Sequence, residues 1–314
     1  MSGRETSMTV PVSSLQRGRL EELTEDECLA LLMQGSVGRI VFVDHGQPVA
    51  LPVNYVLDGK TIAFRTDPGS KLEATTLERI AFEVDGFDLV KREGWSVLVK
   101  GIGRDITDGI DEWSERVSAR HLEPWAAGDR RHWIALTRPT FSGRRICVEG
   151  AETIPPSPHV RSARYDGQES EGPPTMVADR AGLEVLDEEE CLALLASASL
   201  GRVGLTIGGI PAIFPVNYCW HDGQVAFCTD PGTKLRRATE HEVVAFEVDQ
   251  IDPTFRSAWS ILVVGPAREV VDPVVVSLIR EQRVRPWAPG PRDHVVTIYP
   301  AFVSGRRITH ITGA

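Results

Sequence analysis

The chain has 314 residues, 42% of them hydrophobic, which is enough to build two domains with cores of their own. Its formal net charge of −10, without a long basic run, leaves little electrostatic basis for binding nucleic acid. No apolar stretch approaches the roughly 20 residues that span a bilayer, and residues 1–19 lack a signal peptide's apolar region, so we expect a cytoplasmic protein without membrane contact.

Each half of the chain is predicted to open with a short amphipathic helix. Residues 1–19 are expected to be a flexible N-terminus, and Thr24–Glu27 then form a capping-box pattern followed by leucines at 29, 31 and 32. Asp187–Glu190 form a weaker version of this pattern in the second half. We therefore expect one helix after each of these two signals.

Runs of β-branched and aromatic residues follow the first helix and are separated by turn signals. Asp58-Gly59 between two such runs predicts a hairpin. Many short strands with few helices favour a barrel over a βαβ sheet, so the fold class is β-rich, all-β or α+β. The predicted strands of the first half are 39–43, 49–57, 61–66, 80–84, 96–102 and 132–136.

Two Asp-Pro-Gly turns interrupt this pattern, at 67–69 and at 230–232. Each is followed by a segment predicted to form a short helix, 70–77 in the first half and 233–239 in the second. The first turn places a hydroxyl and a lysine, Ser70 and Lys71, at the start of that helix. Free N–H groups, a helix dipole and these side chains would suit a phosphate monoester, although an ordinary strand–turn–helix connection fits the local sequence as well.

The two halves are copies of one another. Residues 38–72 align with 201–235 at a constant offset of 163, and sixteen of these 35 positions are identical. Residues 149–182 between the copies are rich in Pro, Ser, Gly and Glu and lack apolar periodicity, as expected of a linker. We therefore predict a first domain at 20–148, a linker at 149–182 and a second domain at 183–314.

The order PVNY, FRTDPGSK, AFEVD, GWSVLVKG and GRRI in the first copy resembles the pyridoxamine 5'-phosphate oxidase-like, FMN-binding split-barrel family. The resemblance covers both copies. It implies two tandem split β-barrels of Greek-key type with short flanking helices, arranged as an intramolecular pseudo-dimer. It also implies FMN at the interface of the two barrels.

Carried onto this chain, the resemblance assigns cofactor-binding residues in each copy. Arg65, Thr66, Ser70 and Lys71 would hold the phosphate, and Val53, Asn54, Tyr55, Trp95 and Ser96 would border the ring. The second copy would use Asn217, Tyr218, Thr229, Thr233, Lys234, Trp259 and Ser260, but Cys228 replaces Arg65, so we expect a weaker site there.

Several of these residues also have plain structural interpretations. An Asn at a strand edge often satisfies local backbone groups, and Tyr or Trp often packs in a core. The paired arginines at 144–145 and 306–307 either bind an anion across the interface or form ion pairs with nearby acidic residues. The matched His132 and His294 either donate a proton or ligate haem, or are simply structural.

The cysteines suggest neither a disulfide framework nor a zinc site. They are odd in number and lack Cys-x-x-Cys spacing, so we expect reduced thiols and no metal site. The five are Cys28, Cys147, Cys191, Cys219 and Cys228.

The leading hypothesis is a flavin-dependent oxidoreductase with a small-molecule redox substrate and no catalytic residue that the sequence identifies. The alternative is a non-enzymatic protein that binds or carries flavin, a deazaflavin or haem. A third hypothesis is an interaction scaffold without a cofactor. The C-terminal substrate-phosphate signature of true pyridoxamine phosphate oxidases has no match at the GRRI ends. Further homo-oligomers of the pseudo-dimer are compatible with all three hypotheses.

Overall fold

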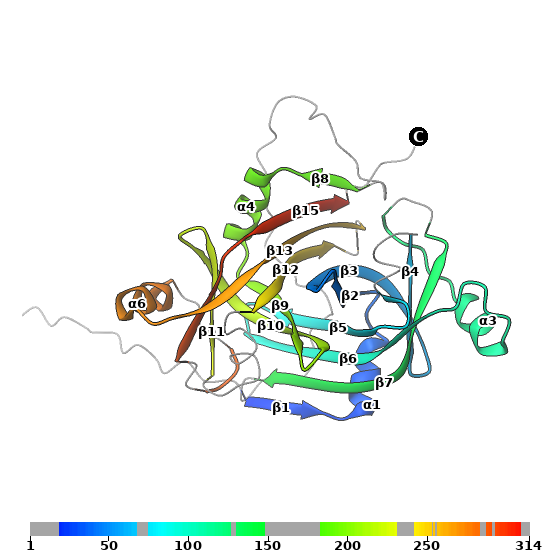
Figure 1. Cartoon of the computed structure of the whole chain (residues 1–314). Coiled ribbons are helices and arrows are strands. Elements are labelled where there is room, and N and C mark those ends of the chain that lie inside the picture. Colours follow the sequence, from blue (N-terminus) through cyan, green and yellow to red (C-terminus); the bar gives the residue numbers. More distant parts are fainter. Residues whose placement is uncertain are drawn as a thin grey trace, which may run out of the picture.

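The computed structural model describes residues 19–67, 75–126, 130–147, 183–230, 242–252, 254, 256–282, 287–290 and 293–308. The predicted N-terminal segment, the linker 149–182, residues 70–74 and the predicted helix at 233–239 lie outside these ranges, apart from Arg19. In the described part, the two copies pack against each other as two β-rich bodies (Figure 1).

The first copy is a barrel that six strands close. Its strands pair in the order β1-β7-β4-β3-β2-β5-β6, and β6 also pairs with β7, which completes the ring. Asp58 faces Thr61 across the predicted Asp58-Gly59 hairpin. The elements are β1 (Arg19–Leu23), α1 (Glu25–Leu32), β2 (Val37–Asp44), β3 (Gln47–Asp58), β4 (Thr61–Thr66), β5 (Arg79–Asp88), β6 (Glu93–Asp105), α3 (Glu112–Ser118) and β7 (His132–Cys147).

The second copy repeats this order, with one interruption. Its strands pair as β12-β9-β10-β11-β14-β13-β15-β8, and β12 also pairs with β13. The long strand β7 of the first copy corresponds to two strands here, β14 and β15, which residues 299–301 separate. The elements are β8 (Glu184–Leu186), α4 (Glu188–Ser197), β9 (Leu200–Ile207), β10 (Ile210–His221), β11 (Gln224–Thr229), β12 (Val243–Asp252), β13 (Ser257–Val270), α6 (Pro273–Glu281), β14 (His294–Ile298) and β15 (Phe302–Ile308).

Both opening helices form where the capping signals predict them. The Thr24 hydroxyl accepts a hydrogen bond from the Glu27 backbone N–H, and the Glu27 carboxylate accepts one from the Thr24 N–H at 2.9 Å. Asp187 caps α4 by accepting from the Glu190 N–H at 2.8 Å, without the reciprocal bond of a full capping box. Each helix buries a cysteine and two leucines in the core of its barrel.

The two copies meet through a face of β2, β3, β5 and β6 in the first and of β9, β10, β12 and β13 in the second. Small and branched apolar side chains form the middle of this contact, among them Val41, Ala50, Ile213 and Ala245. The predicted β-rich fold of two tandem split barrels is therefore confirmed, and the copies form an intramolecular pseudo-dimer. None of the described helices is long and apolar enough to cross a membrane.

Gly38 on β2 is expected to resist substitution because there is no room for a side chain. A Cβ there would lie 2.8 Å from Phe82 Cε1 and 2.9 Å from the Glu83 carbonyl oxygen. We expect Gly38→Ala to lower the free energy of unfolding by about 1–3 kcal/mol, measured by chemical denaturation. The control is Gly204→Ala, whose Cβ would make ordinary contacts at 3.5 Å with Ala245 and Val41. Equal losses in the two variants would show that crowding at Phe82 does not matter.

Candidate functional site

The predicted phosphate side of the first site is at the end of β4. Thr66 is buried and its hydroxyl donates to the Asp67 carbonyl at 3.3 Å. Arg65 belongs to the opposite face of the strand, because successive side chains alternate. Its guanidinium lies over the Trp133 ring, 5.7 Å from the centroid, and Nη1 donates to the Leu122 carbonyl at 3.4 Å. Ser70 and Lys71 lie outside the described residues, so whether they converge with Arg65 stays a prediction.

One nitrogen of Arg65 has an unused hydrogen-bond donor. Nε is buried and has no hydrogen-bond partner within the described part of the chain. A buried charged donor without an acceptor is unfavourable, so an oxygen-rich anion beside Arg65 would satisfy a group that the protein leaves unsatisfied. This donor lies one residue before Thr66, where β4 ends and the predicted phosphate turn begins.

Three of the residues predicted to border the ring pack inside the first barrel. Val53, Tyr55 and Trp95 belong to its buried core, and Trp95 is only 1% exposed. The Tyr55 hydroxyl donates to the Leu32 carbonyl at 2.5 Å, and burial raises the pKa of this phenol. Ser96 is half-buried and stands opposite Asp85 in the β5–β6 pairing. The packing roles are therefore observed, and ring contacts by these residues stay a prediction.

Asn54 connects the barrel to the segment that follows α3. Its Oδ1 accepts a hydrogen bond from the Trp125 N–H at 2.9 Å, and its Nδ2 donates to the Ser36 carbonyl at 3.4 Å. Asn217 repeats the first of these two bonds in the second copy, accepting from the Trp287 N–H at 3.3 Å. The paired asparagines therefore satisfy backbone groups, as the structural interpretation expected, and they fix two segments that reach toward the other copy.

These segments create two related but unequal contact regions, which we call the first and second seams. At the first seam, the Arg256 guanidinium of the second copy donates to the Glu123 carboxylate of the first at 3.0 Å. At the second seam, Trp287 meets Phe87 of the first copy edge to face, with ring centroids 5.6 Å apart. Ile251 takes the place of Phe87 in the repeat, so the first seam lacks this aromatic pair.

The second copy offers less to an anion. Cys228, at the position of Arg65, is buried in an apolar cluster with Ala226, Val295 and Ile279 of α6. Tyr218 packs in the core and donates to the Leu195 carbonyl at 2.7 Å. Of the other predicted residues, Thr229 is buried, Trp259 and Ser260 are half-buried, and Thr233 and Lys234 lie outside the described residues.

The matched histidines each face a carboxylate beside these strand ends. His132 stands opposite Thr66 in the β4–β7 pairing, and its Nδ1 is 3.4 Å from Asp105 Oδ2. His294 pairs with Glu269 in the second copy. Burial works to raise the pKa of Asp105, but hydrogen bonds from Thr107 and from His132 outweigh it and hold this pKa below its usual value.

The second arginine of each pair near the end of a copy forms ion pairs within its own copy. Arg145 lies 3.7 Å from Glu27, and Arg307 lies 3.7 Å from Glu184 and also contacts Glu190. This agrees with the ion-pair alternative for these residues. None of the five cysteines forms a disulfide, and burial raises the pKa of Cys28 and Cys219 to about 11.

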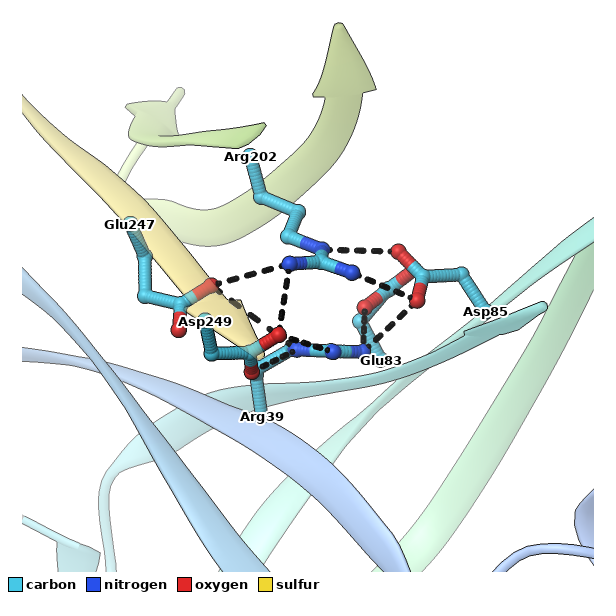
Figure 2. A network of polar contacts seen from close by, with 6 residues as sticks. All are labelled: Arg39, Glu83, Asp85, Arg202, Glu247 and Asp249. Atoms are coloured by element: carbon cyan, nitrogen blue, oxygen red, sulfur yellow. Dashed lines mark hydrogen bonds and ion pairs between the residues drawn. The ribbon is translucent and has the colours of Figure 1, made fainter. Parts of the chain in front are cut away.

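A buried network of six charged side chains joins the two copies at the centre of their contact (Figure 2). We call it the interface network. The Arg39 guanidinium donates to Asp249 of the other copy through Nε at 2.9 Å and Nη2 at 2.8 Å. Arg202 does the same with Asp85, at 2.8 Å from both nitrogens. The members are Arg39, Glu83 and Asp85 of the first copy and Arg202, Glu247 and Asp249 of the second.

Sequence reasoning missed this network, although the sequence carries a signal for it. Glu83 and Asp85 stand in the middle of an apolar strand, and the repeat keeps the same pair as Glu247 and Asp249. Charges in a buried strand need partners, because an isolated buried ion is very unfavourable. The arginine that follows the repeated glycine is the partner in both copies.

A groove also runs between the copies, away from the predicted cofactor residues. Its volume is about 860 Å³, and the β2–β3 and β9–β10 hairpins line it with equivalent residues such as Pro48 and Pro211. Glu78, Arg79 and Glu242 add charges to it. None of the described predicted site residues lines this groove. No group of three or more His, Cys, Asp or Glu side chains suited to a metal occurs among the described residues.

Comparison with known proteins places both copies in one family. The model of the family described as pyridoxamine 5'-phosphate oxidase matches residues 24–145 and again residues 187–307. The curated relative "Uncharacterized protein Rv0080" of Mycobacterium tuberculosis is 43% identical over 129 residues, which are 39% of this chain and 84% of that protein.

Solved structures resemble a single copy. The "FAD binding protein from Mycobacterium smegmatis" is 36% identical, and the match covers 40% of this chain and 97% of that one, with a TM-score of 0.34. A "putative pyridoxamine 5'-phosphate oxidase" from Corynebacterium glutamicum is 29% identical, with coverages of 40% and 94% and a TM-score of 0.35.

Proposed function

Because the chain belongs to the pyridoxamine 5'-phosphate oxidase family through both of its repeats, we propose that it binds a flavin between its two halves and uses it in a redox reaction. FMN is the flavin that the family resemblance implies. Its phosphate would lie at the end of β4, and its ring at the first seam. The reaction partner is a small molecule.

The unsatisfied Nε of Arg65 carries this proposal. Arg65 is half-buried, is held by Trp133 and Leu122, and lies one residue before the turn that leads to Ser70 and Lys71. A phosphate accepts hydrogen bonds at several oxygens, so it suits a guanidinium that keeps an unused donor. The residues described at this position therefore fit the phosphate end of a flavin mononucleotide.

The second seam fits a flavin less well. Cys228 supplies no cation, and its apolar surroundings under α6 disfavour a dianion. The Phe87–Trp287 pair also covers this seam with side chains of the protein itself. We therefore expect the first site to bind the cofactor and the second to be weak or to have lost binding.

A bound flavin would supply the electron or hydride transfer, which amino-acid side chains do not provide. The residues of this chain would bind and orient it. Arg65 would neutralise the phosphate, Asn54 would hold the Trp125 segment against the barrel, and Arg256 with Glu123 would keep the second copy in place over the first seam.

Flavin titration of the full-length protein tests the proposal. The purified protein should take up about one FMN per chain, measured by the quenching of flavin fluorescence. A nicotinamide cofactor or another electron donor should then reduce the bound flavin. Mass spectrometry of the co-purified ligand separates FMN from FAD, deazaflavin and haem. Two equal sites would contradict the asymmetry, an inert bound chromophore would indicate a carrier, and a colourless protein that takes up no cofactor would indicate a scaffold.

A further inference from the structure

The interface network contains more carboxyl groups than cations. Two guanidinium groups face four carboxyl groups, and no side chain of the six is more than 4% exposed. If all four carboxyls were ionised, two negative charges would be buried without a cation. Buried charges without a counter-charge are strongly unfavourable, and the usual outcome is that the group takes up a proton.

The geometry distinguishes the two aspartates from the two glutamates. Asp249 and Asp85 each accept two short hydrogen bonds from the guanidinium of the other copy. Each also accepts one from the guanidinium of its own copy, at 2.8 Å for Asp85 and 2.9 Å for Asp249. These contacts are those of ionised carboxylates paired with arginine.

Glu83 and Glu247 take only the remaining contacts. The hydrogen bonds that they accept from Arg39 and Arg202 are long, at 3.3 and 3.5 Å. In both glutamates Oε1 is buried and has no hydrogen-bond partner among the described residues. An ionised carboxylate in this position would have one oxygen with neither water nor a donor.

Each glutamate also lies close to the aspartate two residues further along its strand, Glu83 to Asp85 and Glu247 to Asp249, because both members of each pair accept from the same guanidinium nitrogen. Two buried carboxyl groups held this close are favourable only if one of them carries a proton, because two ionised carboxylates repel each other and neither has a hydrogen to donate. The aspartates are already occupied by arginine, so the proton belongs to the glutamates.

We propose that the interface network is a two-proton site, in which Glu83 and Glu247 stay protonated at neutral pH and the contact between the two copies weakens when these protons leave. With both protons bound, two arginines balance two aspartates. This proposal does not depend on a flavin.

Within the described part of the chain, no cation other than Arg39 and Arg202 forms an ion pair with the four carboxyl groups. The charges of the network also act on two phenols, those of Tyr55 and Tyr218, which lie in the two cores. Each donates its proton to a backbone carbonyl, of Leu32 and Leu195 respectively, and burial raises the pKa of both. They stay neutral and do not compensate charge.

The direction of the pH dependence follows from the pKa shifts. Burial, reinforced by the neighbouring aspartate, raises the pKa of Glu83 and of Glu247 well above the usual value of a glutamate. The stability that these groups contribute is fully present below the usual pKa of about 4.3 and is lost as pH rises through the raised pKa. Asp85 and Asp249 have lowered pKa values, since their arginines outweigh burial, so their contribution is lost only in acid.

Infrared spectroscopy of the full chain in heavy water tests the proton site directly. At neutral pH the wild type should show the carbonyl band of a protonated carboxylic acid, and Glu83→Gln/Glu247→Gln should lack it. The matched control is Glu78→Gln/Glu242→Gln, which makes the same substitution at two equivalent exposed positions and should keep the band. A wild type without the band, or a variant that keeps it, would overturn the proposal.

Thermal denaturation tests the weakening of the contact. Between about pH 5 and about pH 9, the Tm of the wild type should fall more steeply than that of Glu83→Gln/Glu247→Gln, because glutamine mimics the protonated acid at every pH. Glu78→Gln/Glu242→Gln should follow the wild type. A double variant that is far less stable than the wild type at neutral pH, or that has the same slope, would contradict the proposal.

Discussion

Replacing Arg39 by methionine is expected to lower the free energy of unfolding by about 3–5 kcal/mol, the usual cost of removing one partner from a buried ion pair. Arg39 donates two hydrogen bonds to Asp249 and one each to Asp85 and Glu83. Methionine fills much of the same volume but donates nothing, so carboxylates of both copies lose a counter-charge at once. Chemical denaturation followed by tryptophan fluorescence measures the loss.

Arg256→Met is the matched control, since Arg256 also forms an ion pair between the copies. Its side chain is 45% exposed, and its partner Glu123 is 63% exposed. Exposed pairs contribute about 0–1 kcal/mol because water screens them and their side chains lose entropy. If Arg39→Met were no more destabilising than Arg256→Met, the interface network would not be what holds the two copies together.

Local signals predicted the frame of the barrel well. The capping box at Thr24 and the Asp58-Gly59 hairpin act through neighbouring residues, so one short stretch of sequence contains all the information. The strands are longer than their apolar centres: β6 was expected over 96–102 and runs from Glu93 to Asp105. The ends of a strand form backbone hydrogen bonds whether their side chains are polar or apolar. The pattern of apolar residues therefore does not show where a strand begins or ends.

Two helices were missed for opposite reasons. α6 contains three consecutive valines and an isoleucine, which favour strands, and it forms because Asp272 caps it and Pro273 starts it. α3 is short and mostly polar and depends on the Asp111 cap, whose carboxylate accepts from the Ser114 N–H at 3.0 Å. In both cases the signal was the capping aspartate, which in α6 is followed by a proline.

The interface network could not be assembled from one copy alone. Arg39 and Asp249 are 210 residues apart, and their pairing depends on how the two barrels face each other. The repeated Glu and Asp within an apolar strand did indicate buried charge, but not which cation meets which carboxylate. The motifs also did not distinguish core residues from candidate cofactor residues. Val53, Tyr55 and Trp95 pack into the core, although Asn54 and Ser96 belong to the same motifs.

If the flavin phosphate binds at the end of β4, Arg65→Met is expected to weaken FMN binding about tenfold to a hundredfold. Hydrogen bonds to charged groups contribute about 1.5–3 kcal/mol, which corresponds to that range in Kd. Methionine keeps an apolar stem that can pack on Trp133, so the barrel should remain folded while the unsatisfied Nε donor is lost. Fluorescence titration with FMN gives the Kd, and Tm checks that the fold is intact.

Cys228→Ala is the matched control, because Cys228 occupies the equivalent position on β11 and packs among apolar side chains. Removing its thiol should leave the FMN affinity unchanged. Equal losses of affinity in the two variants would show that the cofactor does not distinguish the copies. If Arg65→Met has the same Kd for FMN as the wild type, Arg65 does not bind the phosphate. The replacement of this arginine by cysteine in the second copy would then not explain why one seam binds the flavin and the other does not.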